Sequence, residues 1–247
     1  MGDCAVYGWR ARLGILVPSG NIALEPEFGL MTPKGVSCHY HRFNFTGGGS
    51  EEEIVRHLRK AEEFISDASE MIAHVRPAVV VMAGTGVSFI DGYGYDQMLI
   101  KKMKERNGNL PTTTTSTSVI DAFRKMKITK VSIGMAYVER VSRTVMKFVE
   151  DSGVKVLNAK WLNKAGHDIA EVSKETIYHL AREVNVPESQ AIFISCVNLH
   201  TVEVIETIEK DLQKPVITSN QATMWNILRL ANINDKIQGY GQLLSEY

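Results

Sequence analysis

The chain has 247 residues, 44% of them hydrophobic, and its 28 basic and 28 acidic side chains give zero formal net charge. This length suffices for one large or two small domains with buried cores. The charge balance argues against nucleic acid, whose binding needs a basic face. No apolar run approaches the roughly 18 residues of a membrane span, and the N-terminus lacks a signal-peptide core. Three scattered cysteines form no disulfide framework, so a reducing cytoplasm is expected.

Short apolar segments alternate with helical patterns along the chain. Helix starts are indicated by two capping boxes, Ser50–Glu53 and Ser118–Asp121. Nearly continuous apolar strands between helices are typical of parallel sheets covered on both faces, which bind ligands beyond the carboxyl ends of their strands. We expect strands at 13–17, 79–82, 131–135, 192–195 and 216–218, extended segments at 36–45 and 154–161, and a strand with a turn at 112–115. Helices are expected at 51–75, 96–107, 118–126, 138–152, 173–183, 201–212 and 224–231.

The second half of the chain repeats the first. Residues 12–17 match 130–135, residues 79–84 match 191–196, and residues 110–118 match 214–222. The repeat predicts an α/β fold of two pseudo-symmetric, Rossmann-like subdomains with parallel sheets and a central cleft between them. The predicted first subdomain comprises residues 1–115 plus 219–247, and the second comprises 116–218.

The most informative difference between the two halves is at the end of one matched strand, which is followed by Gly84 in the first half and by Cys196 in the second. Under a pseudo-twofold relation, these residues face each other across the cleft. A thiol with nothing opposite it can deliver a proton to only one face of a substrate. A buried cysteine can also be a small core residue, but the helix expected from Thr201 would lower the pKa of a nearby thiol.

Residues after the other matched strands offer donors for an anion. Gly84, Thr85 and Gly86 combine backbone amides with a hydroxyl, although a simple tight turn is the alternative interpretation. A dinucleotide fingerprint is excluded because its third glycine is missing. Pro18 to Asn21 and Tyr137 would complete a ring of donors whose size suits a small carboxylate.

The remaining candidates carry no chemistry of their own. His39 and His41 alternate on one strand but have no third ligand at a useful spacing, so no metal is expected. Cys4 and Cys38 lie in no comparable setting and are interpreted as structural. The sequence contains neither a Ser-His-Asp pattern nor a Walker loop.

Seven motifs are spread over essentially the whole chain. They are YGWRARLGILVPSGN at 7–21, LEPEF at 24–28, GTGVSFIDG at 84–92, Ala136-Tyr137, SCVNL at 195–199, TSNQATMW at 218–225 and GYG at 239–241. Together they resemble the aspartate/glutamate racemase superfamily, in the branch of the maleate cis-trans isomerases and arylmalonate decarboxylases. The family fold, two pseudo-symmetric α/β subdomains around a cleft, agrees with the repeat.

The resemblance implies a reaction. Racemases and isomerases of this superfamily use two cysteines on opposite faces of the substrate, whereas here Cys196 matches the second and Gly84 stands in place of the first. That pattern is similar to the arylmalonate decarboxylases, although the segments around Asn21, Asn198 and Asn220 are more similar to the isomerases. Gly86 and Val197 depart from the decarboxylases, which have a hydroxyl residue and a glycine there, so the expected substrate class is the wider one of substituted malonates.

The function implied is cofactor-independent decarboxylation of a substituted malonate-type acid, with Cys196 protonating the enediolate on one face. The alternatives are a maleate-type isomerase or racemase of a small carboxylic acid, and a carboxylate binder without turnover. No partner beyond the small carboxylate is expected, and a homo-oligomer is compatible with the sequence. The residues expected to bind the substrate are Pro18, Asn21, Gly84, Thr85, Gly86, Tyr137, Val197 and Asn198.

Overall fold

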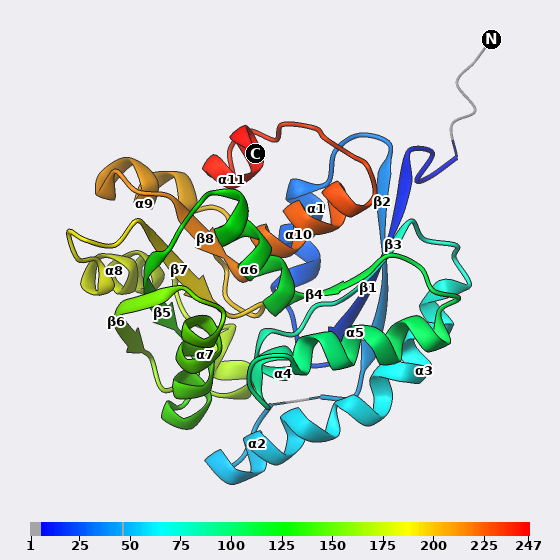
Figure 1. Cartoon of the computed structure of the whole chain (residues 1–247), viewed down its shortest axis with the longest axis horizontal. Helices are drawn as coiled ribbons and strands as arrows, with labels where there is room; N and C mark the ends of the chain where they lie inside the picture. The colour runs from blue at the N-terminus through cyan, green and yellow to red at the C-terminus, as the bar shows by residue number, and fades with distance from the viewer. Residues whose placement is uncertain (1–5, 46) are drawn as a thin grey trace.

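The protein is built from two four-stranded parallel sheets (Figure 1), described by a computed structural model over residues 6–45 and 47–247. The strand orders correspond, β2-β1-β3-β4 in one sheet and β6-β5-β7-β8 in the other, which confirms the predicted α/β fold. The strands are β1 (Ala11–Pro18), β2 (Val36–Phe43), β3 (Val79–Met82), β4 (Thr112–Thr114), β5 (Lys130–Met135), β6 (Lys155–Trp161), β7 (Ala191–Ser195) and β8 (Val216–Thr218).

Helices cover both sheets. In the first half they are α1 (Leu24–Met31), α2 (Glu51–Lys60), α3 (Glu62–Ala73), α4 (Thr85–Phe89), α5 (Tyr95–Arg106) and α6 (Thr115–Lys125). In the second they are α7 (Glu139–Asp151), the 3₁₀ helix η1 (Gly166–Ile169), α8 (Lys174–Val184), α9 (Ile205–Leu212), α10 (Ser219–Leu230) and α11 (Gln242–Glu246). Every side chain of β3 and of β7 is buried, as expected for central strands of covered parallel sheets.

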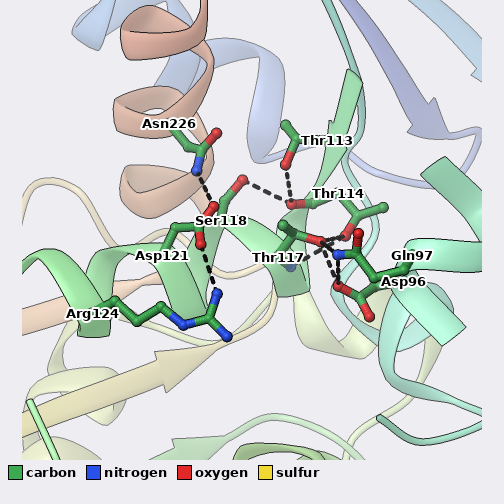
Figure 2. Close-up of polar contacts among 9 residues, drawn as sticks. All are labelled: Asp96, Gln97, Thr113, Thr114, Thr117, Ser118, Asp121, Arg124 and Asn226. Carbon is green, nitrogen blue, oxygen red and sulfur yellow. Dashed lines mark hydrogen bonds and ion pairs between the residues drawn. The ribbon is translucent and has the colours of Figure 1, made fainter. Parts of the chain in front are cut away.

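Helices α6 and α10 lie side by side at the centre of the molecule (Figure 1), and α10 contacts both β3 and β8. Figure 2 shows the polar contacts that tie this region together. Asp96 of α5 accepts a hydrogen bond of 2.5 Å from the Thr117 hydroxyl, and Asn226 of α10 donates to Asp121 of α6 at 3.1 Å. These two bonds connect α5, α6 and α10. The predicted division of the chain at residues 115 and 218 stays a prediction.

Two predicted helix starts were wrong by several residues. Helix α6 begins at Thr115 because the Thr114 side chain accepts from the Thr117 amide and so caps the helix; Ser118 lies inside it and donates to the Thr114 carbonyl. Helix α10 begins at Ser219, where Thr218 and Gln221 form a capping box. Polar residues at these helix starts concealed both caps in the sequence pattern.

Two further helices differ from their predicted extents. The helix expected over 51–75 is two helices, because the Phe64 amide bonds to the Ala61 carbonyl three residues back and breaks the regular ladder. The helix expected from Thr201 begins at Ile205 and is preceded by a turn over residues 202–204, where the amides of Thr201 and Val202 donate to a side-chain carboxylate. The short helices α1, α4, η1 and α11 had not been predicted. Cys4 lies outside the described residues.

Within residues 6–45 and 47–247, the structure has no helix with the length and apolar character needed to span a membrane.

Candidate functional site

A cavity of about 80 Å³ lies at the carboxyl ends of β1, β3, β5 and β7. In both sheets the strand order reverses between these strands, β1 and β3 in one and β5 and β7 in the other. Such switch points are where open parallel sheets leave a crevice for ligands. The cavity brings together all nine residues predicted for the site, namely Pro18, Asn21, Gly84, Thr85, Gly86, Tyr137, Cys196, Val197 and Asn198.

Cys196 follows β7 and presents a nearly buried thiol, with 5% of the residue exposed. The Asn198 backbone amide donates to the Cys196 sulfur at 3.4 Å. The Cys196 backbone amide donates to the Ser219 hydroxyl at 3.1 Å. Burial raises the pKa of Cys196 to about 11, outweighing the bond from the Asn198 backbone amide, which lowers it. The expected lowering by a helix at Thr201 is wrong because that helix begins at Ile205. The thiol is therefore protonated at neutral pH.

Gly84 ends the equivalent strand of the first half, in an extended conformation with φ −152°. It begins the short helix α4, so the tight-turn interpretation is wrong. Its carbonyl accepts from the Ser88 hydroxyl at 3.0 Å, and Ser88 accepts from the Ser116 amide of α6, which fixes the start of α4. No acceptor among the described residues takes the amides of Thr85 and Gly86. These two amides are free donors at the cavity wall.

A hydroxyl chain crosses between the two halves beneath the cavity. Thr85 donates to Ser219 at 3.0 Å, and the same Ser219 oxygen accepts from the Cys196 amide. The Tyr137 hydroxyl is buried and has no hydrogen-bond partner among the described residues. Its pKa is raised well above the ordinary value, first by burial and then by the neighbouring Cys196. Tyr137 is therefore a neutral donor that is left unsatisfied beside the cavity.

The two asparagines of the site tie its loops to each other. Asn21 donates to the Val197 carbonyl at 2.9 Å and accepts from the Leu24 amide at 2.9 Å. The Asn198 oxygen accepts from the Ile22 amide at 2.9 Å. Each side chain therefore links the loop after β1 to the loop after β7, and their substrate-binding role stays a prediction.

Several cavity residues had not been predicted. Lys164, on the loop after β6, is the one charged residue lining the cavity, and no carboxylate of the described chain lies within ion-pair distance of it. Nothing in the sequence distinguished this lysine from other loop lysines. The other unpredicted residues, Ile54, Leu58, Val138, Val141, Ala165 and Ile169, form an apolar wall together with Phe45 and Val87. Ile54 and Leu58 are spaced four residues apart, which is also typical of an ordinary core stripe.

The residues that the structure describes contain no cluster of three or more His, Cys, Asp or Glu side chains able to hold a metal ion. His39 bonds to Ser37 at 2.9 Å, and a nitrogen of His41 is buried without a partner. Cys38 lies in β2 beside the Thr32 hydroxyl.

The family model for arylmalonate decarboxylase matches residues 13–244. Arylmalonate decarboxylase from Bordetella bronchiseptica is 30% identical over 94% of this chain and 92% of its own length. Maleate isomerase from Geobacillus stearothermophilus is 22% identical over 95% and 97%. The crystal structure of a liganded arylmalonate decarboxylase double mutant, with glycine changed to cysteine and cysteine to serine, gives a TM-score of 0.86 at 26% identity, covering 96% and 99% of the two chains.

Proposed function

The chain belongs to the arylmalonate decarboxylase family, and from that premise we propose that it is a cofactor-independent decarboxylase of a substituted malonate-type diacid. Its relatives are enzymes, either decarboxylases or maleate isomerases. The observation that carries the proposal is the pairing of Cys196, a protonated thiol, with Gly84, which has no side chain, on equivalent strands of one cavity. A proton donor is needed after CO₂ leaves, whereas a two-cysteine reaction lacks its second thiol at position 84.

The free donors of the cavity support a binding mode for the carboxylate that remains. In the proposed complex it accepts from the amides of Thr85, Gly86 and Val197 and from the Tyr137 hydroxyl. None of these groups has an acceptor in the described structure. Negative charge grows on this carboxylate as the enediolate forms, so preorganised donors stabilise the transition state, each by about 3 kcal/mol.

The departing carboxylate occupies the apolar wall formed by Val87 and its neighbours. The bond between the α-carbon and this carboxylate breaks, its electron pair passes into the enediolate, and neutral CO₂ leaves. Poor solvation of a carboxylate charge in this region favours the neutral product. Cys196 then gives its proton to the α-carbon from its own side, and the resulting thiolate takes a proton from water.

The test is incubation with phenylmalonate, methyl-phenylmalonate and maleate while CO₂ and products are followed. We expect CO₂ from a malonate, abolished in Cys196→Ala. Conversion of maleate to fumarate without CO₂ would contradict decarboxylation and indicate an isomerase. Tight binding without turnover across a broad diacid panel would indicate a carboxylate binder.

A further inference from the structure

Glu27 is a buried carboxylate outside the cavity, with 4% of the residue exposed. It lies on α1, and it accepts hydrogen bonds from the loop that follows Cys196. The Thr201 amide donates to it, the Val202 amide donates at 2.9 Å, and the Thr201 hydroxyl donates at 3.3 Å. We call residues 196–202 the Cys196 loop. One carboxylate therefore anchors the far end of this loop to the other half of the molecule.

The same carboxylate reaches the near end of the loop through Asn220, the second residue of α10. The Asn220 amide nitrogen donates to Glu27 at 2.6 Å and to the Val197 carbonyl at 3.2 Å. The Val197 carbonyl also accepts from Asn21 at 2.9 Å. Helices α1 and α10 lie against each other (Figure 1), so the link is short and held by packed elements. The carbonyl of Val197, the residue after Cys196, therefore accepts from the side-chain amides of Asn21 and Asn220, and Glu27 orients the second of these.

We infer that Glu27 is a positioning residue, which through Asn220 and the Cys196 loop holds the thiol and the Val197 amide in register with the substrate. This inference rests on the proposed function. Glu27 lines no part of the cavity, so it acts through the loop without touching the substrate. Small displacements of a reacting group lower the rate by large factors. A residue that fixes the Cys196 loop without touching the substrate can therefore affect catalysis.

The chain provides a matched control in Glu209. This second buried glutamate, on α9, also accepts backbone amides, from Val216 at 2.9 Å and Gln242 at 3.0 Å. No hydrogen bond of Glu209 involves the Cys196 loop. Replacing either glutamate by glutamine removes a buried carboxyl group, but only Glu27→Gln sets a side-chain amide against the Asn220 amide and disturbs the bond to Val197.

The experiment compares Glu27→Gln, Asn220→Ala and Glu209→Gln by kcat, by the enantiomeric excess of product from methyl-phenylmalonate, and by the rate of Cys196 alkylation by iodoacetamide, read by peptide mapping. We expect Glu27→Gln and Asn220→Ala to lower kcat about tenfold or more. They should also lower the enantiomeric excess, because solvent then competes with the displaced thiol, and change the alkylation rate severalfold. Glu209→Gln should lower the melting temperature while leaving all three readouts near wild type.

Unchanged enantiomeric excess and alkylation in both Glu27→Gln and Asn220→Ala would overturn the inference, as would equal changes in Glu209→Gln. If Glu27→Gln does not fold, Asn220→Ala decides the matter. If the wild-type protein releases no CO₂, the proposed function fails, but the alkylation rates still test the positioning role on their own.

Discussion

At the residue scale, the proposed chemistry depends on the two residues at equivalent strand ends of the cavity, Cys196 and Gly84. Cys196 offers a proton, because burial keeps its pKa at about 11, and Gly84 offers nothing from the equivalent strand. A single donor fixes the face from which the enediolate is protonated. The same asymmetry leaves no second group to remove a proton, so racemisation of the product is expected to be negligible.

Restoring the missing group should therefore create a new activity. In Gly84→Cys, the added Cβ would lie 3.0 Å from the Met82 sulfur and 3.4 Å from a Val87 methyl. The extended backbone at Gly84 accepts any side chain, and the flexible Met82 can move, so the variant should fold. We expect it to racemise α-substituted monoacids and to exchange their α-proton in D₂O, both measurable by NMR and chiral chromatography. A folded variant with no exchange would contradict the opposed geometry.

Lys164 should favour the doubly charged substrate over the singly charged product. An exposed ion pair contributes up to about 1 kcal/mol, so Lys164→Met should raise KM for the diacid at most about fivefold. Inhibition by the monoacid product should weaken less. Lys164→Arg serves as the charge-preserving control, and the effect should shrink in high salt. Equal changes for substrate and product would show that Lys164 does not discriminate by charge.

At the scale of elements, α2 closes one side of the cavity with Ile54 and Leu58. It lies between the Gly47–Gly49 segment and the ladder break at Ala61. Its Glu51 accepts from the Arg140 amide at 2.6 Å, in the first turn of α7. A carboxylate is favoured at a helix N-terminus, so this bond holds α2 over the cavity.

Loss of this bond should loosen α2. A capping interaction of about 1 kcal/mol means that Glu51→Ala should raise KM about fivefold and change kcat less. The neighbouring Glu52→Ala, whose side chain is exposed and makes no hydrogen bond among the described residues, is the control. Hydrogen exchange of α2 should quicken only in the first variant. Identical KM values in the two variants would show that Glu51 does not hold α2 in place.

The elements also show what could be predicted from the sequence. The strands were found because buried parallel strands are apolar runs, as in β3 and β7. Helix α4 was missed because five residues containing a glycine and two hydroxyls carry no helical periodicity. The start of α9 was placed four residues too early, in a segment whose Thr201 amide donates to a carboxylate of α1, 174 residues away in the sequence. Such long-range contacts, like the approach of Lys164 to the cavity, leave no local pattern.

At the scale of the whole molecule, stability should depend on two buried carboxyls. Burial raises the pKa of Glu27 and of Glu209 to about 7, from an ordinary value of 4.5. Their folded-state pKa lies above the unfolded one, so their contribution to stability is complete below pH 4.5 and is lost as the pH rises through 7.

Urea denaturation of the wild type and of Glu209→Gln between pH 5 and 8 measures this effect. The wild type should lose on the order of 2–3 kcal/mol relative to the variant as the pH rises. Using the difference cancels groups with the opposite sign, such as His39, whose pKa is lowered by burial and Arg12. Parallel curves for the two proteins would show that Glu209 does not titrate in this window.

The central claim concerns the pseudo-symmetry of the whole molecule, in which Gly84 and Cys196 occupy equivalent positions on opposite sides of one cavity. The most direct measurement is the configuration of the monoacid formed from methyl-phenylmalonate by the wild type and by the double variant Gly84→Cys, Cys196→Ser. We predict one enantiomer from the wild type and the opposite enantiomer from the double variant, because the thiol has changed sides. The same enantiomer from both proteins would contradict one-sided protonation by Cys196.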